Sequence, residues 1–275
     1  MRFLRAFSVI TIGLSVVAVS PTASLAYDSS GGTGSGGSVG NAIFAGVQYG
    51  TPPSGKSSKD TSGCVWVPAG EAATVEGTLV DTKVVKGTTY HLFIRACPTS
   101  NQGVWVPTVT TRNLALNAAA KVKELLAPPS FGSAPPAANG VVNVGMWSWT
   151  SPAEFTRHSI TAWVPTPTGI AWTTTTATPV SLVLKSGEPG SAPMVCQGPG
   201  TPWNPAFGDE AVSECMYTYR HSSEISPSGM FDAQLSIVWK IAWTSNVGGG
   251  ATLPDVVTTT HQAMIIREIQ AVVTS

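Results

Sequence analysis

One segment matches a chemical motif letter for letter: Gly50–Ser57 reads GTPPSGKS. The pattern GxxxxGK(S/T) is that of a phosphate-binding loop, whose backbone N–H groups cradle phosphates between a strand and a helix. Pro52 and Pro53 remove two of these donors, and the residues between Ser57 and Cys64 carry no apolar helical face. We therefore interpret the match as a product of Gly/Ser/Pro-rich composition, and we keep ATP or GTP binding as an alternative.

Residues suited to hydrolysis are present without a recognisable arrangement. No GxSxG segment occurs, and the serines that follow one of the histidines do not make a catalytic triad by adjacency alone. Three acidic residues share one predicted loop, which is read as a solvated loop, a calcium site or a catalytic site. The histidines are His91, His158, His221 and His261, and the acidic residues are Asp209, Glu210 and Glu214. We assign no catalytic, cofactor-binding or metal-binding residue from the sequence.

The N-terminus has the pattern of a secretory signal peptide, residues 1–26. Two basic residues precede a short apolar run, and small residues stand at the −3 and −1 positions of a cut before Tyr27. The basic residues are Arg2 and Arg5, the apolar run is Phe7–Val19, and the small residues are Ser24 and Ala26. The alternative is an uncleaved anchor, but a membrane span needs about 20 apolar residues. We expect a secreted or cell-surface protein with no membrane span after cleavage.

The expected export of the chain decides how its four cysteines are interpreted. An even number of cysteines in an exported chain favours disulfides, and four cysteines allow three pairings. We favour Cys64–Cys97 and Cys196–Cys215, because the two pairs fall in different segments of the chain. The alternative is a zinc site, which is disfavoured because no CxxC occurs and no histidine stands at ligand spacing beside a cysteine.

The composition limits the classes of partner. Charged residues make up 11% of the chain, against about 25% in soluble globular proteins, and the formal net charge is zero. A neutral chain without basic blocks lacks the charge distribution of nucleic-acid-binding proteins. The apolar share of 43% is enough to build a core. Few ionisable groups remain for a catalytic site, so the composition favours a scaffold or binding role.

The chain divides by composition into five segments. These are a signal peptide (1–26), a Gly/Ser-rich flexible linker (27–63), a small β module (64–112), a helix with a Pro-rich connection (113–140) and a β-sandwich (141–275). Within the linker, the more apolar residues 41–49 are a candidate short strand.

The spacing of apolar residues predicts one helix, over residues 113–127. Asn113 is its expected N-cap, and Pro128 and Pro129 end it. The apolar residues fall on one helical face, and they are Leu114, Ala118, Val122 and Leu125.

Short runs of β-branched and aromatic residues predict many strands. The clearest is Leu235–Thr244, which alternates with a period of two. The other expected strands are 64–67, 88–97, 103–109, 141–149, 159–164, 170–178, 180–185, 256–260 and 263–273. Many short strands, Gly/Pro turns and little helix indicate a mainly β fold of the sandwich type.

Nine tryptophans are many for a chain of this length. Six lie on predicted strands, where we expect most of them in the core because aromatic side chains bury large apolar areas. They are Trp147, Trp149, Trp163, Trp172, Trp239 and Trp243. Trp203 lies in the Pro-rich segment 198–205. It is either an exposed residue that stacks on a ligand such as a sugar ring, or a residue packed over the disulfide of Cys196.

The C-terminal half resembles the end of PKD-like (polycystic kidney disease repeat) domains. Those domains have a tyrosine, a turn with glycine, an aromatic residue and then an alternating strand. Here Tyr219, Gly229 and Phe231 precede the alternating run to Trp243, and Tyr219 and Phe231 take the two aromatic positions. PKD-type domains usually carry a WxxGDG turn upstream, of which Val183–Gly190 keeps only a partial match.

A longer stretch, roughly residues 88–273, is similar to a group of exported actinobacterial proteins with a PKD-like domain. The matching pieces follow the same order: Ile94–Cys97, Trp105–Pro107, Pro128–Pro129, Val144–Trp149, Cys196–Pro202, Cys215–Ser223, and the strand with Trp239 and Trp243. The resemblance implies a PKD/immunoglobulin-like β-sandwich at the cell envelope, and the group has no established activity.

Together these features predict a non-catalytic secreted or cell-surface protein that interacts with a protein or glycan partner and needs no cofactor. The alternative is a secreted hydrolase with a site between the two modules.

Overall fold

The computed structural model describes residues 38–39, 42–44, 47–54, 59–60, 62–72, 81–208 and 210–269. The predicted signal peptide lies outside these residues, as do Lys56 and Ser57 of the phosphate-loop match. Within the described ranges no helix has the length and apolarity needed to cross a membrane. The described chain is mainly β, as predicted, and forms four sheets with one helix longer than a single turn.

The N-terminal sheet has the strand order β1-β2-β7-β6-β4, with β5 also paired to β6. Its strands are β1 (Ser38–Val39), β2 (Ala42–Phe44), β4 (Val65–Pro68), β5 (Thr82–Val85), β6 (Thr88–Cys97) and β7 (Ser100–Pro107). The single-turn helix α1 (Ala69–Ala72) follows β4. Strands β1 and β2 come from the range predicted as linker, and β2 runs parallel to β7.

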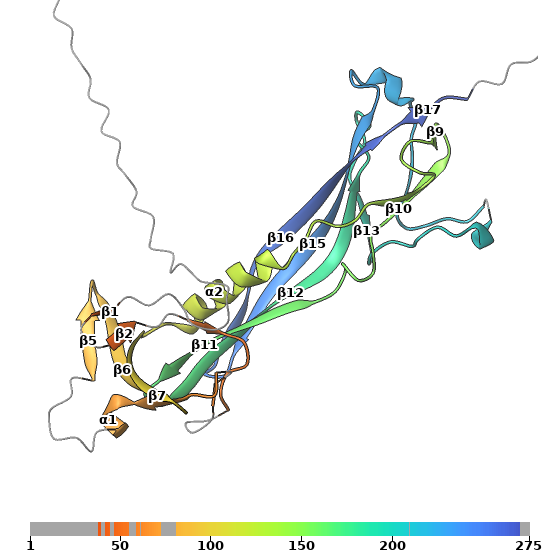
Figure 1. The fold of residues 1–275 in the computed structure, drawn as a ribbon. Coiled ribbons are helices and arrows are strands. Elements are labelled where there is room, and N and C mark those ends of the chain that lie inside the picture. The colour runs from red at the N-terminus through yellow and green to blue at the C-terminus, as the bar shows by residue number, and fades with distance from the viewer. Residues whose placement is uncertain are drawn as a thin grey trace, which may run out of the picture.

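A long antiparallel sheet extends through the molecule (Figure 1). Its order is β16-β15-β12-β11-β3, with β13 also paired to β12. The strands are β3 (Gln48–Tyr49), β11 (His158–Thr166), β12 (Gly169–Lys185), β13 (Met194–Cys196), β15 (Phe231–Ser245) and β16 (Gly250–Met264). The last two contain 15 residues each, which corresponds to a length of about 50 Å.

Two prolines that suggest strand ends in the sequence lie inside continuous strands. The predicted strands 170–178 and 180–185 are one strand, β12, because its pairing with β15 shifts register between Pro179 and Ser181. Strand β16 likewise continues through Pro254, beside the register shift between Trp239 and Ile241 of β15. Such irregularities accommodate proline, which has no N–H to donate to the ladder.

Helix α2 (Thr111–Glu124) packs on β11, β12 and β15. Its N-cap is Thr110, whose hydroxyl accepts from the Asn113 N–H at 3.1 Å, so the predicted N-cap, Asn113, is wrong. Threonine in an extended conformation satisfies one of the free N–H groups of the first turn. Leu125 was also misplaced: it caps the C-terminus and is 48% exposed, and Leu126 is buried instead.

A small three-stranded sheet lies at the end of the long sheet opposite the N-terminal sheet (Figure 1). Its order is β14 (Met216–Thr218), β10 (Gly145–Trp149) and β8 (Gly132–Ala134). Beside it, β17 (Ile266–Arg267) pairs in parallel with β9 (Gly140–Val141). Two single 3-10 turns, η1 (Pro205–Phe207) and η2 (Ser223–Ile225), flank β14 in the sequence.

Three buried clusters form the core. The first joins the N-terminal sheet to α2, β11 and β12, and it includes Trp66, Phe93, Leu114, Ala118 and Trp163. The second lies between the C-terminal half of α2 and the long sheet, and contains both cysteines of the Cys196–Cys215 disulfide. The third lies under the small sheet and includes Met146, Tyr219 and Phe231.

Candidate functional site

Strand β10 carries two tryptophans on one face and a buried serine on the other. Successive residues of a strand point to opposite faces, so Trp147 and Trp149 share one face, and Met146 and Ser148 share the other. Met146 is 2% exposed and Ser148 is 1% exposed. The indoles lie on the face opposite the third core cluster, where Trp147 is 6% exposed and Trp149 is partly exposed. Strand β10 is therefore covered on both faces at Trp147.

The two neighbouring strands extend this face on both sides of β10. Trp147 pairs with Met216 of β14 and with Ala134 of β8, and Gly145 pairs with Thr218. Directly paired residues of antiparallel strands project from the same face. The three strands therefore form one continuous surface with the indoles at its centre.

A covering loop, defined as residues 200–208 and 210–214, lies against this surface. Just before the loop, the Thr150 N–H donates to the Pro199 carbonyl at 2.8 Å, and just after it the Ser148 N–H donates to the Cys215 carbonyl at 2.8 Å. The Cys196–Cys215 disulfide joins the chain on either side of the loop. Both ends of the loop are therefore bonded to β10 or to the residue that follows it, and the disulfide joins them to each other.

Two glycines allow these elements to approach closely. A Cβ atom on Gly200 would lie 2.6 Å from the carbonyl oxygen of Ser148, and the residue has a φ of 76°, which L side chains rarely adopt. A Cβ atom on Gly132 would lie 2.3 Å from Nε1 of Trp149. Glycine at these positions lets the covering loop meet β10 and lets the Trp149 indole lie against β8.

The covering loop and the small sheet enclose a cavity of about 710 Å³, a volume typical of ligand-binding sites. Trp203 reaches it from the covering loop and is 40% exposed. Trp147 stacks on Phe207 of the loop, with ring centroids 5.8 Å apart. Most other lining residues are apolar, among them Ala134, Pro135, Pro136, Val144, Ala211, Val212 and Met216. Trp203 therefore shares one cavity with Trp147, which is buried as expected for most of the strand tryptophans, and with Trp149, which is only partly buried.

Polar groups are few on the cavity wall. Among its described lining residues, Glu210 is the single charged side chain, and Ser133 and Thr218 provide hydroxyls. None of the indole N–H groups of the three tryptophans donates to another described residue. The wall can therefore stack on a flat or ring-shaped ligand, donate hydrogen bonds to acceptors and attract one positive charge.

Glu188, in the loop between β12 and β13, fixes the C-terminal end of β14. Its carboxylate accepts from the Tyr217 hydroxyl at 2.5 Å, and from the Arg220 N–H, the His221 N–H and the His221 ring Nδ1 at 2.9 Å each. Burial by itself raises the pKa of Glu188, but these hydrogen bonds outweigh it and hold the pKa below its ordinary value. The sequence signal for this residue was only the partial WxxGDG match.

Glu154, a second carboxylate that accepts several hydrogen bonds, fixes the chain beside β8. It accepts from the Ser130 N–H at 2.8 Å, the Ser130 hydroxyl at 2.7 Å and the Thr150 hydroxyl at 2.6 Å. Burial raises the pKa of Glu154, and the hydrogen bonds from Thr150 and Ser130 more than offset that effect, so the pKa is lowered. Glu154 therefore links the segment that precedes β8, at Ser130, to the residue that follows β10, Thr150.

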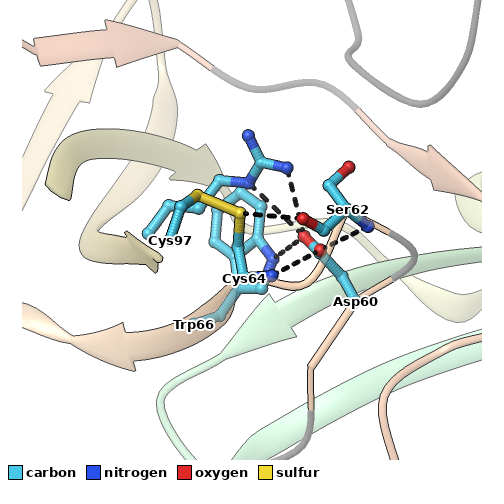
Figure 2. The surroundings of a disulfide bond; sticks show 6 residues. Asp60, Ser62, Cys64, Trp66 and Cys97 are labelled. Carbon is cyan, nitrogen blue, oxygen red and sulfur yellow. Dashed lines mark hydrogen bonds and ion pairs between the residues drawn. A yellow bond between two sulfur atoms is a disulfide. The ribbon is translucent and has the colours of Figure 1, made fainter. Parts of the chain in front are cut away.

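A third carboxylate, Asp60, is engaged at the Cys64–Cys97 disulfide (Figure 2). One oxygen accepts from the backbone N–H groups of Ser62 and Cys64, and the other accepts from the Trp66 indole at 3.0 Å and from Arg95 at 3.3 Å. Burial raises the pKa of Asp60, but these hydrogen bonds and the charge of Arg95 lower it overall. All its bonding capacity serves the fold, so we assign this cluster a structural role.

The structure does not gather the histidines or the predicted acidic loop into one site. His158 lies 5.7 Å from the Trp239 ring, and His261 pairs with Asp232 at 2.9 Å. Glu210 and Glu214 are exposed on the covering loop, and Asp209 lies outside the described residues. In the part of the chain that the structure describes, no group of three His, Cys, Asp or Glu residues is placed to hold a metal.

A smaller cavity of about 190 Å³ lies between the N-terminal sheet and the β11–β12 turn. A hydrolytic site between the two modules would be expected in this region. Its described lining contains one carboxylate, Asp81, and one imidazole, His91. Neither paired carboxylates nor a Ser-His-acid set occurs in this described lining.

Comparisons with known proteins do not assign this chain to a family. A scan against protein-family models and searches of curated proteins and of solved structures find no match to the chain.

Proposed function

We propose that this chain is a non-catalytic secreted or cell-surface protein, and that the tryptophan-lined cavity binds its protein or glycan partner. The observation that supports the proposal most is the convergence of Trp147, Trp149 and Trp203 on one cavity. Aromatic side chains are costly to expose, and they concentrate at recognition surfaces because one buried indole contributes a large contact area.

The proposal extends to the fold and the location. The C-terminal part of the chain is a PKD-like, immunoglobulin-like domain, exported by the signal peptide 1–26. Support comes from Tyr219 and Phe231, the two aromatic positions of the resemblance, whose rings stack with centroids 5.6 Å apart. Two disulfides agree with an oxidising compartment.

The test is binding of the full secreted chain to glycan and peptide arrays, compared with the Trp203→Ala variant. We expect at least one ligand class whose signal falls at least about tenfold in the variant, since such a loss is usual for an aromatic anchor. Ile225→Ala, which removes a side chain that is 56% exposed outside the cavity, should leave the signal unchanged. Equal binding by wild type and Trp203→Ala for every ligand would reject the cavity as the binding site.

A further inference from the structure

We propose that the tryptophan-lined cavity binds a proline-rich peptide that carries a basic residue. This inference rests on the proposed binding function of the cavity and names the class of its ligand. The argument uses the donors, acceptors and charge of the cavity wall.

The first step compares hydrogen-bonding capacity. A sugar carries hydroxyls around its ring, and a sugar site must supply donors and acceptors to match them. The described wall offers only Glu210, Ser133 and Thr218 as polar side chains beside the tryptophans. Buried hydroxyls without partners would cost affinity, so the wall is a poor match for an oligosaccharide.

The second step concerns what the wall does supply. A polyproline II segment has no internal hydrogen bonds, and its proline residues present carbonyl acceptors and apolar rings but no N–H donors. Such segments dock on aromatic-lined grooves. Trp203 and the partly exposed Trp149 provide stacking surfaces for proline rings, while the ring of Trp147 is already stacked on Phe207. The indole N–H groups of the three tryptophans are not used by described residues and can donate to the carbonyls.

The third step is charge. Glu210 is exposed at the cavity and makes no ion pair with a described residue. A negative charge at the edge of an apolar groove favours a ligand with a positive charge at the matching place. The peptide therefore needs an arginine or lysine within its proline-rich segment.

The fourth step is rigidity. The disulfide and the backbone hydrogen bonds from Ser148 and Thr150 hold the covering loop, and Gly132 gives room to the Trp149 indole. A rigid tryptophan-lined cavity and a rigid polyproline II ligand both lose little conformational entropy on binding. This matching preorganisation favours a proline-rich segment over a flexible one.

The experiment is a tryptophan-fluorescence and calorimetric titration of the full secreted chain. The probe is a capped peptide that repeats Pro-Pro-Arg three times. Companion peptides repeat Pro-Pro-Gln and Gly-Gly-Arg, and the oligosaccharide probes are cellohexaose and chitohexaose. Variants are Trp203→Ala, Glu210→Gln and the control Ile225→Ala, each checked for an unchanged circular dichroism spectrum.

We expect saturable binding of the Pro-Pro-Arg peptide that weakens at least about tenfold in Trp203→Ala. Glu210→Gln should weaken it about two- to fivefold, as for an exposed ion pair, and should have no effect on the Pro-Pro-Gln peptide. Binding of an oligosaccharide that depends on Trp203, without binding of either proline-rich peptide, would overturn this inference and leave the proposed function standing. Binding of the Gly-Gly-Arg peptide as tight as that of Pro-Pro-Arg would also overturn it. If no probe binds and no array ligand depends on Trp203, both proposals fail.

Discussion

At the residue scale, the buried carboxylates of this protein hold the chain in place. The Glu188 side chain is 4% exposed and the Asp60 side chain 5% exposed, and each accepts several hydrogen bonds. Removing such a carboxylate leaves several donors without a partner, and each buried donor left unpaired costs stability.

We predict that Glu188→Gln lowers the free energy of unfolding at pH 7 by about 1–3 kcal/mol, because an amide cannot accept all four hydrogen bonds. The folded-state pKa of Glu188 lies below its ordinary value, so the unfolded state binds the proton more readily. The stabilisation is therefore complete above the unfolded-state pKa of about 4.3, and it is lost as the pH falls through the lower folded-state pKa. Urea unfolding between pH 3 and pH 7 measures both effects.

The matched control for this prediction is Glu224→Gln, which changes an exposed glutamate on η2. It should leave stability within about 0.5 kcal/mol of wild type. The stability difference between wild type and Glu188→Gln should shrink toward acid pH. A difference that stays constant over the whole range would show that Glu188 is not held as an ionised acceptor.

Some of this residue-level detail was visible in the sequence, and the reason differs from case to case. The pairing of the four cysteines followed from their segmental placement, and the structure has both bonds. Trp203 was singled out because of its Pro-rich surroundings. The role of Glu188 depends on Tyr217 and His221, about 30 residues away along the chain, and contacts at such separation leave no local pattern to read.

At the element scale, the threonine-rich strand β12 makes different hydrogen bonds on its two faces, to helix α2 on one and to strand β11 on the other. Thr173 and Thr175 are fully buried and donate to the α2 carbonyls of Thr111 and Ala115. On the opposite face, Thr174 bonds Thr161 of β11 at 2.7 Å. A β-branched residue with a hydroxyl suits both faces, which explains why a run of threonines lies at the centre of the sheet.

We predict that Thr175→Val lowers the free energy of unfolding by about 1 kcal/mol, because it removes one buried hydrogen bond and keeps the volume. Thr176→Val, on the outer face, should change it by less than about 0.5 kcal/mol, since water can replace the partner of an exposed hydroxyl. Thermal unfolding of the two variants side by side makes the comparison. Equal effects would mean that the bond from Thr175 to α2 contributes nothing specific.

We predict that the double variant Cys196→Ala/Cys215→Ala loses about 3 kcal/mol of stability, the loop-entropy value for a bridge across 19 residues. It should also weaken binding at the tryptophan-lined cavity, because the covering loop loses one of its attachments. Calorimetric titration of the variant with the Pro-Pro-Arg peptide measures the second effect.

The control for the disulfide prediction is Cys64→Ala/Cys97→Ala, which opens the other bridge, in the N-terminal sheet. Stability should fall in this variant too, while the affinity of the cavity stays at the wild-type value. If both double variants weaken ligand binding equally, the covering loop does not depend on its own disulfide.

Elements were predictable to the extent that local signals decide them. Strand β6 begins and ends where the sequence indicates, at Thr88 and Cys97. The N-terminus of α2 was misplaced because Thr110 and Asn113 are both good caps, and the choice depends on where the helix meets β11 and β12. The continuity of β12 through Pro179 depends on the register shift with β15, which a single strand cannot reveal.

At the scale of the whole molecule, the long sheet runs between the N-terminal sheet and the small three-stranded sheet (Figure 1). The tryptophan-lined cavity lies at one end, and the N-terminal sheet packs at the other through Trp66, whose ring meets that of Trp163 edge-on at 6.2 Å. The mainly β class could be predicted from composition and turn residues. The pairing of β3 with β11 could not, because a two-residue strand more than 100 residues away in the chain carries no local sign of its neighbour.

The shared core of the N-terminal sheet, α2 and β11 predicts that the described chain unfolds in one cooperative transition. Trp66→Ala creates a cavity in this core and should cost about 3–5 kcal/mol, whereas Val84→Ala, at a side chain 68% exposed, should be nearly neutral. Far-ultraviolet circular dichroism reports the whole chain, and a fluorescent label on Ile225→Cys reports the distant end near β14. Because the two ends are joined by continuous strands and one packed helix, both signals should shift by the same amount in Trp66→Ala. A label transition that stays at the wild-type midpoint while part of the dichroism signal is lost earlier would show instead that the N-terminal sheet unfolds as a separate unit.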